Sequence, residues 1–419
     1  MAGQKDSRVF TIEEIFEVAE RNSRQLQPSF AAETEAMREI DVATSGRLPE
    51  IDASLSLSFI GDGFTTKRNF SDYKKAPIPH FGNTLNVSVT QPVYTGGALT
   101  AGIKLAELKL TASRYATELC RDNIRFQLTG FYLDLYKFIN LRKVVRSNIS
   151  RAGKVLDEMR ARYDQGTALY NDITRYELLV SNLELQLAKI DNTITILNTN
   201  LVTISGLPEN TVVIPDSTIL TKSLPVESES VWQSEARINS PAVRLAKSEV
   251  DISRQAEALV KADRLPKVGL QAGWGIDGPI LVEVPPINRN LATWFVGVGV
   301  SYNLSSLYKN NKALAKSQAA TLKSSDRLAV AYENTELSVR ADYIRYLEAY
   351  EELKTQQKSV ELADRNYSTV FTRYSADMAL ITDMLDAANA RLDAEQQLVN
   401  ARINIIYYYY KLLFTSGKI

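Results

Sequence analysis

The chain has 419 residues, and its 49 Lys and Arg residues balance 49 Asp and Glu residues, so the formal net charge is zero. This balance argues against a basic face for nucleic acid. One Cys (Cys120) and one His (His80) leave almost no material for disulfides, a Cys/His metal site or a nucleophile–imidazole pair. The length predicts two or three domains or one elongated body. No run of 18 apolar residues occurs, which excludes a membrane-spanning helix.

Residues 1–46 are predicted to form N-terminal helices. Thr11-Ile12-Glu13-Glu14 has the pattern of a capping box, and a break at Gln27-Pro28 precedes a second helix that ends near Gly46. The opening Met1-Ala2-Gly3-Gln4-Lys5 is not followed by the apolar core of a secretory signal. The chain is therefore either cytosolic or a mature form whose signal peptide has been removed.

Residues 47–95 are predicted to form a β-hairpin. After Pro49 the hydrophobic period changes to 2, and apolar and small polar residues alternate from Ile51 to Phe59. A polar loop follows, and a second alternating run closes at Gln91-Pro92. The pattern predicts two strands of about ten residues, each with one apolar face.

Residues 96–206 are predicted to form a long helical hairpin that turns at Asp164-Gln165-Gly166. Apolar positions in its second arm recur every three and four residues, which predicts left-handed coiled-coil packing. Residues 207–240 are irregular, and residues 241–263 have the pattern of a helix.

Residues 264–304 repeat the hairpin pattern, and Arg264-Leu265-Pro266 matches the earlier Arg47-Leu48-Pro49. Residues 305–416 contain neither Gly nor Pro from Lys309 to Ser416, so nothing interrupts helical hydrogen bonding there. We expect two antiparallel helices folded at the polar patch Tyr374–Met378. Residues 417–419 form a short tail.

The two halves of the chain align at a shift of about 211 residues. Arg162-Tyr163 corresponds to Arg373-Tyr374, Asp172 to Asp383, and Tyr132 to Tyr343. Each half has the order helix, strand, loop, strand, long helix, tight turn, helix. The chain is therefore predicted to be a structural duplication.

The four strands favour a membrane barrel over a soluble sandwich. Each has about the length that crosses a bilayer at a 45° tilt, and the face opposite the apolar one is rich in Ser, Gly, Asn and Thr, as expected for a lumen. Four strands cannot close on themselves, and open edges are not tolerated in lipid. Two copies give eight strands, which side chains would fill, whereas three give twelve, which leaves a hole. A duct therefore favours a homotrimer.

Three sets of residues, taken together, resemble the TolC family of outer-membrane efflux and secretion ducts. They are the paired Arg-Leu-Pro strand starts, the junction Gln91-Pro92-Val93-Tyr94-x-Gly96-Gly97, and two Arg-Tyr-x5-Ala-Leu-x2-Asp segments. The resemblance covers nearly the whole chain. It implies an α+β membrane protein: a trimeric 12-stranded β-barrel, with four strands per chain, continuous with a long α-helical coiled-coil barrel. The implied location is the bacterial outer membrane, with the helices extending into the periplasm.

The resemblance also implies a passive exit duct for drugs and toxic compounds, without cofactor. Its partners would be a periplasmic adaptor (membrane fusion) protein, an inner-membrane pump or ABC exporter, and outer-membrane lipid. Residues 207–239 and residues near the C-terminus would form an equatorial collar. Trp274, Trp294 and Tyr302 fit an aromatic girdle at a membrane interface, although core aromatics of a soluble sheet would give the same pattern.

The chain departs from the family pattern at several points. The second junction, Tyr302-Asn303-Leu304-Ser305-Ser306-Leu307, lacks the Gly pair and the Pro. Asp377 stands where the first tip has Gly166. No N-terminal Cys is present, so a lipid anchor cannot be inferred from this chain.

Three groups of functional residues follow from the resemblance. Asp383 and Asp386 would form an acidic ring at the periplasmic pore entrance, and the alternative is that they only complement a helix dipole. Asp172 and Tyr374 would form a latch that keeps the entrance shut, and part of this latch is expected to be absent because Ala379 replaces a basic partner. The tips that contact the adaptor would comprise Gly166, Thr167, Ala168, Leu169, Asp377, Met378, Ala379 and Leu380.

No Walker loop, dinucleotide motif or catalytic triad occurs, so no enzyme, catalytic residue or metal site is predicted. The run Tyr407–Tyr410 is expected to pack against the collar and not to stack on nucleic acid, because nothing basic and periodic accompanies it. Two alternatives to small-molecule efflux stay open. One is the duct of a type I protein or peptide secretion system, and the other is a soluble coiled-coil scaffold.

Overall fold

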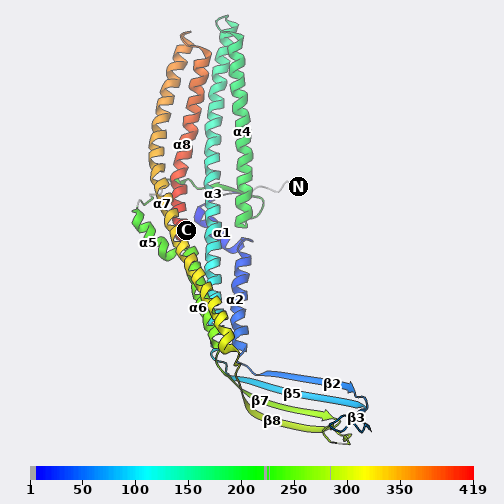
Figure 1. The fold of residues 1–419 in the computed structure, drawn as a ribbon. Coiled ribbons are helices and arrows are strands. Elements are labelled where there is room, and N and C mark those ends of the chain that lie inside the picture. Colours follow the sequence, from blue (N-terminus) through cyan, green and yellow to red (C-terminus); the bar gives the residue numbers. More distant parts are fainter. Residues whose placement is uncertain (1–5, 221–223, 226, 284) are drawn as a thin grey trace. The chain divides into compact units, whose positions relative to one another are not determined.

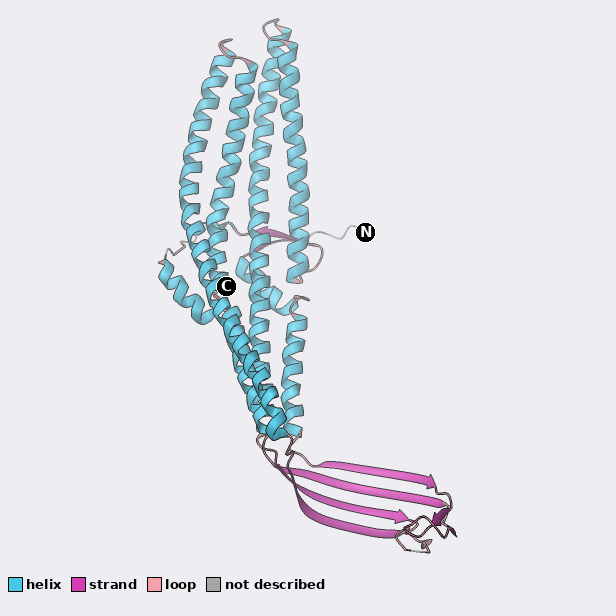
Figure 2. Ribbon diagram, in the orientation of Figure 1, coloured by secondary structure: helices cyan, strands magenta, loops and turns pink. Residues whose placement is uncertain are grey.

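The structure, a computed structural model, describes residues 6–220, 224–225, 227–283 and 285–419 (Figures 1 and 2). The opening Met1–Lys5 and parts of the predicted collar (221–223 and 226) lie outside the described residues, as does position 284 of the second predicted β-hairpin. The chain divides into two compact units, and each is described by itself. Unit 1 comprises Met1–Ala32, Ser113–Ala246 and Leu328–Ile419, and unit 2 comprises Glu33–Ala112 and Lys247–Arg327.

The first helix begins at the predicted capping box. Thr11 N–H donates to Glu14 Oε2 at 2.9 Å, and Glu14 N–H donates to Thr11 Oγ1 at 3.2 Å, at the start of α1 (Ile12–Asn22). The helix α2 spans Gln27–Ser45, so the break lies at residues 23–26 and the prediction of a break at Gln27-Pro28 is wrong. Pro28 lies in the first turn of α2, where a missing N–H costs no helical hydrogen bond.

Two parallel strands in unit 1 were not predicted. β1 (Asp6–Phe10) pairs with β6 (Thr211–Pro215), in segments expected to be helical and irregular. The short helix η1 (Ser217–Leu220) and α5 (Glu229–Asn239) also lie in the segment predicted to be irregular. The buried Tyr132 hydroxyl donates to Phe10 O and accepts from Asp216 N–H, both at 2.8 Å, so this hydroxyl joins both strands to the long helix that carries it.

Four long helices form the two predicted hairpins. They are α3 (Ala98–Asp164) with α4 (Tyr170–Ser205), and α7 (Ser306–Ser375) with α8 (Ile381–Thr415). The 67 residues of α3 correspond to a length of roughly 100 Å. In unit 1 the arms of both hairpins lie side by side, with both turns at the same end (Figure 1). Helix α6 spans Pro241–Ala262.

The tyrosine run of α8 packs as expected. Tyr410 is buried. The ring centroids of Tyr407 and Phe126 are 5.8 Å apart, and those of Tyr409 and the buried Trp232 are 6.4 Å apart in an edge-on arrangement. These side chains belong to two of the hydrophobic clusters of unit 1. Their role is therefore in the core.

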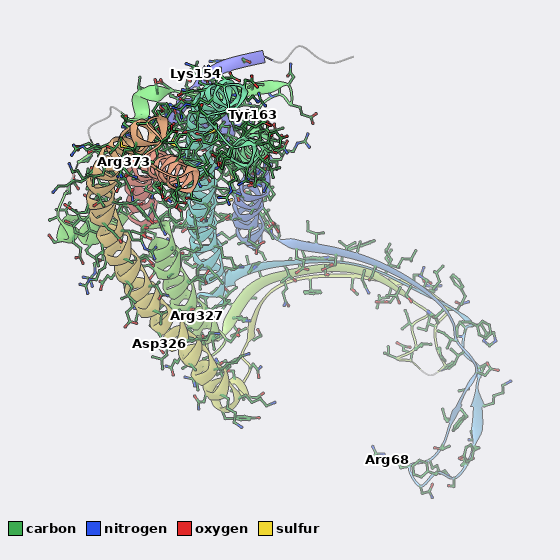
Figure 3. The ribbon with its side chains drawn as sticks, turned by 90° about the horizontal axis from the view of Figure 1, so that it is seen from above. Arg68, Lys154, Tyr163, Asp326, Arg327 and Arg373 are labelled. Atoms are coloured by element: carbon green, nitrogen blue, oxygen red, sulfur yellow. The ribbon has the colours of Figure 1, made fainter. Side chains whose placement is uncertain are left out.

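Unit 2 contains a four-stranded antiparallel sheet. Its strands are β2 (Glu50–Phe59), β5 (Phe81–Tyr94), β7 (Lys267–Gly278) and β8 (Leu291–Ser301), in this order across the sheet. The sheet is curved (Figure 3). β5 continues past the predicted end at Gln91-Pro92, because a register shift between Pro92 and Tyr94 accommodates the proline. A small hairpin, β3 (Gly63–Thr65) with β4 (Lys74–Ala76), occupies the predicted polar loop.

One face of this sheet is apolar and exposed. Its exposed large hydrophobic side chains on the two outer strands are Ile51, Leu55, Leu57, Phe59, Trp294, Val296, Val298 and Val300. Such a contiguous apolar surface marks contact with another apolar phase, a protein or a lipid. In the described part of the chain, no helix is both long and apolar enough to cross a membrane.

Candidate functional site: the turns of the helical hairpins

The first turn, between α3 and α4, depends on Gly166. This residue has φ 76°, in the left-handed region that glycine adopts without steric cost. Gly166 N–H donates to Tyr163 O at 2.8 Å, and Thr167 N–H donates to Arg162 O at 2.9 Å. These two bonds satisfy the last carbonyls of α3 in a Schellman motif and reverse the chain.

The second turn, between α7 and α8, repeats this geometry with another residue. Asp377 has φ 58°, its N–H donates to Tyr374 O at 3.1 Å, and Met378 N–H donates to Arg373 O at 2.8 Å. Asp is among the few residues that enter the left-handed region as single residues. The substitution of glycine noted in the sequence therefore preserves the turn.

The aspartates of the predicted acidic ring have different surroundings. Asp383 Oδ2 accepts a hydrogen bond from Leu380 N–H at 3.0 Å and thus caps the start of α8. Asp386 lies one turn further along and is exposed, as Asp383 is. Asp383 therefore has a structural role at the helix start, while both carboxylates are accessible to ions.

The two predicted latch residues lie close together within one chain. Burial raises the pKa of Tyr374, the nearby Asp172 carboxylate raises it further, and the Arg162 guanidinium opposes both. A tyrosine whose charged form is disfavoured in this way stays protonated, so its hydroxyl is available as a donor at neutral pH.

Arg162 is a residue of this site that the sequence reasoning did not single out. It comes from α3, yet its guanidinium donates to Ser375 O at the end of α7 and lies 3.6 Å from the Asp377 carboxylate. Its side chain is 24% exposed. Arg162 therefore places a positive charge beside the second turn, where position 379 is alanine and not a basic residue. The signal in the sequence was the duplicated Arg-Tyr pair, but only the fold shows which copy reaches the other hairpin.

The outer ends of both turns are exposed and apolar. Leu169 and Leu380, at equivalent positions, are exposed, and so is Met378. Tyr163 and Arg373 mark the ends of α3 and α7 in the view along the bundle (Figure 3). Beneath them the arms of all four helices share one hydrophobic cluster that includes the fully buried Met384 and Met159. This cluster holds the turns together from within.

Comparison with known proteins gives a consistent result. A sequence model described as "Outer membrane efflux protein" matches residues 16–207 and 232–407. The outer membrane protein TolC of Vibrio cholerae is 20% identical over 400 residues, covering 94% of this chain and 87% of that protein. The pyoverdine export outer membrane protein OpmQ of Pseudomonas putida is 22% identical over 407 residues, covering 94% of this chain and 83% of that protein.

The fold is also similar to a solved structure. The outer membrane protein VceC of Vibrio cholerae superposes with a TM-score of 0.78 at 15% identity, covering 97% of this chain and 96% of that one. At this identity the likeness concerns the fold alone. It extends over both helical hairpins and the four-stranded sheet.

Proposed function

The chain belongs to the outer membrane efflux protein family, and we propose that it is the passive exit duct of a tripartite pump that carries small molecules from the periplasm to the outside. It is an outer-membrane protein of a family of channels and not of enzymes. The observation that carries the proposal is the four-stranded sheet, with an exposed apolar face and an outer strand at each side.

The sheet supports a trimeric barrel of twelve strands. Within the described residues, β2 pairs only with β5 and β8 pairs only with β7, so each of the two outer strands has one side without a neighbour. Lipid requires every strand edge to be paired, and three copies joined β8 to β2 meet this requirement and leave a lumen. The exposed Trp274 and Trp294, paired across β7 and β8, suit the membrane interface. The long helices would then continue as the periplasmic coiled-coil barrel.

The assembly can be tested by mass measurement in mild detergent and by membrane fractionation. We expect a trimer that sediments with outer membranes and resists extraction. A monomer or a dimer would contradict the barrel, and a protein that is soluble without detergent would favour the coiled-coil scaffold.

The exposed turns support contact with a periplasmic adaptor. Their apolar ends, Leu169, Met378 and Leu380, form a small patch suited to helical tips of a partner. In a Cys120→Ser background, Thr167→Cys should crosslink to a cysteine at an adaptor tip. The matched control is Ile238→Cys, at an exposed position of α5 in the proposed collar. Crosslinks at position 238 alone would contradict contact at the tips.

The acidic ring can be tested without disturbing the helix start. Asp383→Asn/Asp386→Asn removes the charges and keeps an oxygen that can accept from Leu380 N–H. Six carboxylates around a pore attract cations, so we expect the double variant to lose cation selectivity in a planar bilayer and to bind a blocking trivalent cation more weakly. The control is Asp157→Asn, an exposed aspartate on α3. Unchanged selectivity and block would contradict the acidic ring and would mean that Asp383 serves only to cap α8.

The cargo is proposed to be a small molecule and not a polypeptide. The support is the match to OpmQ, whose name gives pyoverdine as the exported substance. Secretion of a protein or peptide is the alternative. Loss of the gene should sensitise cells to toxic compounds on the first proposal and should deplete the medium of one polypeptide on the second.

A further inference from the structure

The polar face of the sheet consists of small and polar residues, except for Phe295 in the middle of β8 and Leu291 at its start. Successive side chains of a strand alternate between faces, and the register puts Asp52, Ser88, Gly273 and Phe295 in one row across the four strands. The face opposite Trp294, Val296 and Val298 is otherwise lined by small or polar residues along the middle of the sheet. Phe295 is 58% exposed on this face.

Three glycines of this face, Gly273, Gly275 and Gly299, are covered by longer side chains from neighbouring strands. A Cβ added at Gly275 would overlap the Asn86 amide, and one added at Gly299 would lie 3.1 Å from Gln271 Nε2. A Cβ added at Gly273 would overlap the Phe295 ring. Amides therefore cover two of these glycines, while an aromatic ring covers the third.

Packing over Gly273 accounts for the position of only one face of the Phe295 ring. An aromatic side chain that packs over a cross-strand glycine stabilises the sheet. The other side of the Phe295 ring is accessible, on a surface where a Gln or Asn would cover the glycine without exposing an apolar face. This exposed ring is unexplained by packing alone.

The charges of the same face favour cations. Glu50, Asp52 and Asp277 lie on the polar side of their strands by alternation, and Lys267, at the end of β7, lies 3.8 Å from the Asp263 carboxylate. An accessible ring face carries negative electrostatic potential and attracts cations. Carboxylates and a ring face together suit an organic cation with an apolar body.

We propose that Phe295 forms a contact site in the lumen for aromatic organic cations. The inference rests on the proposed trimeric barrel, in which threefold symmetry sets three copies of the ring at one height. Weak binding at such a site is compatible with passage, because conduction requires that a solute can both enter and leave.

The test is block of the purified wild-type trimer by tetraphenylphosphonium in a planar bilayer, with potassium conductance as the reference. Phe295→Ser should weaken the block by roughly two- to thirtyfold, the range from an exposed to a desolvated cation–π contact. Phe295→Tyr, which keeps the ring, should retain it. Phe295→Leu still covers Gly273 but lacks the ring, so it should fold and weaken the block. This variant tests the proposal if the serine variant fails to fold.

Position 297 offers a matched control on the same strand face. No atom lies within 4 Å of a Cβ added at Gly297, so Gly297→Ser should leave the block unchanged and Gly297→Phe, which adds a second ring, should strengthen it. If the wild type forms no channel, both the proposed function and this inference are overturned. If it conducts but shows no block, or if Phe295→Leu blocks as the wild type does, only the inference about Phe295 is overturned.

Discussion

The two helical hairpins turn with the same backbone geometry but place their charges differently. Both turns use a left-handed residue and the same two backbone bonds, at Gly166 and at Asp377. Arg162 of the first hairpin reaches the second, whereas its counterpart Arg373 is exposed. Asp386 occupies the position that corresponds to Arg175. The two hairpins thus share their turns, whereas several of their polar positions differ.

This difference has a physical reason. Turn geometry and buried apolar contacts are required in both copies for the hairpin to fold, so few residues satisfy them. Surface charges cost little to change. Two hairpins with equivalent turns can therefore form a contact with each other, such as Arg162 with Asp377, without loss of either hairpin.

The largest expected difference between the copies concerns Asp122 and its counterpart Glu333. Asp122 is 8% exposed, and burial raises its pKa to about 6, against the opposing effect of nearby Arg125 and Arg121. Since the unfolded group titrates near 3.8, the folded state binds more protons between pH 4 and 6. Stability from this group is present below about pH 4 and is lost as pH rises through 6.

Asp122→Asn should therefore stabilise the protein by about 3 kcal/mol at pH 8, with the gain fading as pH falls from 6 to 4. Thermal unfolding of the detergent-solubilised protein across this pH range checks it. Glu333→Gln, on the exposed copy, should change stability by less than about 0.5 kcal/mol at any pH. An equal response of the two variants would show that burial does not distinguish the two copies.

The second prediction concerns the left-handed positions. Gly166→Val should destabilise by about 1–3 kcal/mol, because a β-branched residue is strained at φ 76° although space around it is open. Gly166→Asp should cost less, since Asp377 adopts this conformation in the other turn. Equal losses for the two variants, measured by thermal unfolding, would mean that the turns are not equivalent.

The third prediction concerns the contact between the hairpins. Arg162→Ala should destabilise by about 1 kcal/mol, because it removes both the hydrogen bond to Ser375 O and the ion pair with Asp377. Arg373→Ala is the matched control and should have no measurable effect. In a double-mutant cycle with Asp377→Ala, the pair should couple by about 0.5 kcal/mol. No coupling would mean that the ion pair is not formed in solution.

The smallest effect is expected at the helix starts. Asp383→Ala should cost about 0.5–1 kcal/mol, because the Leu380 N–H loses its acceptor. Asp383→Asn should recover most of this loss. Thermal unfolding that is unchanged in the alanine variant would contradict the cap seen at α8.

The long helices and the strands were predictable because their signals are periodic and extended. The absence of Gly and Pro between Lys309 and Ser416, and the alternation from Ile51 to Phe59, each involve many residues. β1 and β6 escaped prediction because five-residue strands carry little pattern, and their pairing across about two hundred residues is set by the Tyr132 hydroxyl and the core. The contact of Arg162 with Ser375 and Asp377 also joins distant segments, so the residues around Arg162 alone could not predict it.

The pairing of β5 with β7 has a consequence for how the chain acquires its structure. These central strands are hydrogen-bonded neighbours, yet residues 95–266 separate them in the sequence. Contacts between distant segments form late, because the entropy of closing the intervening loop must be overcome first. The β2–β5 hairpin therefore exists for a time with both of its edges bare, a state prone to aggregation. A holding chaperone that covers residues 50–94 until β7 emerges would shorten this exposure.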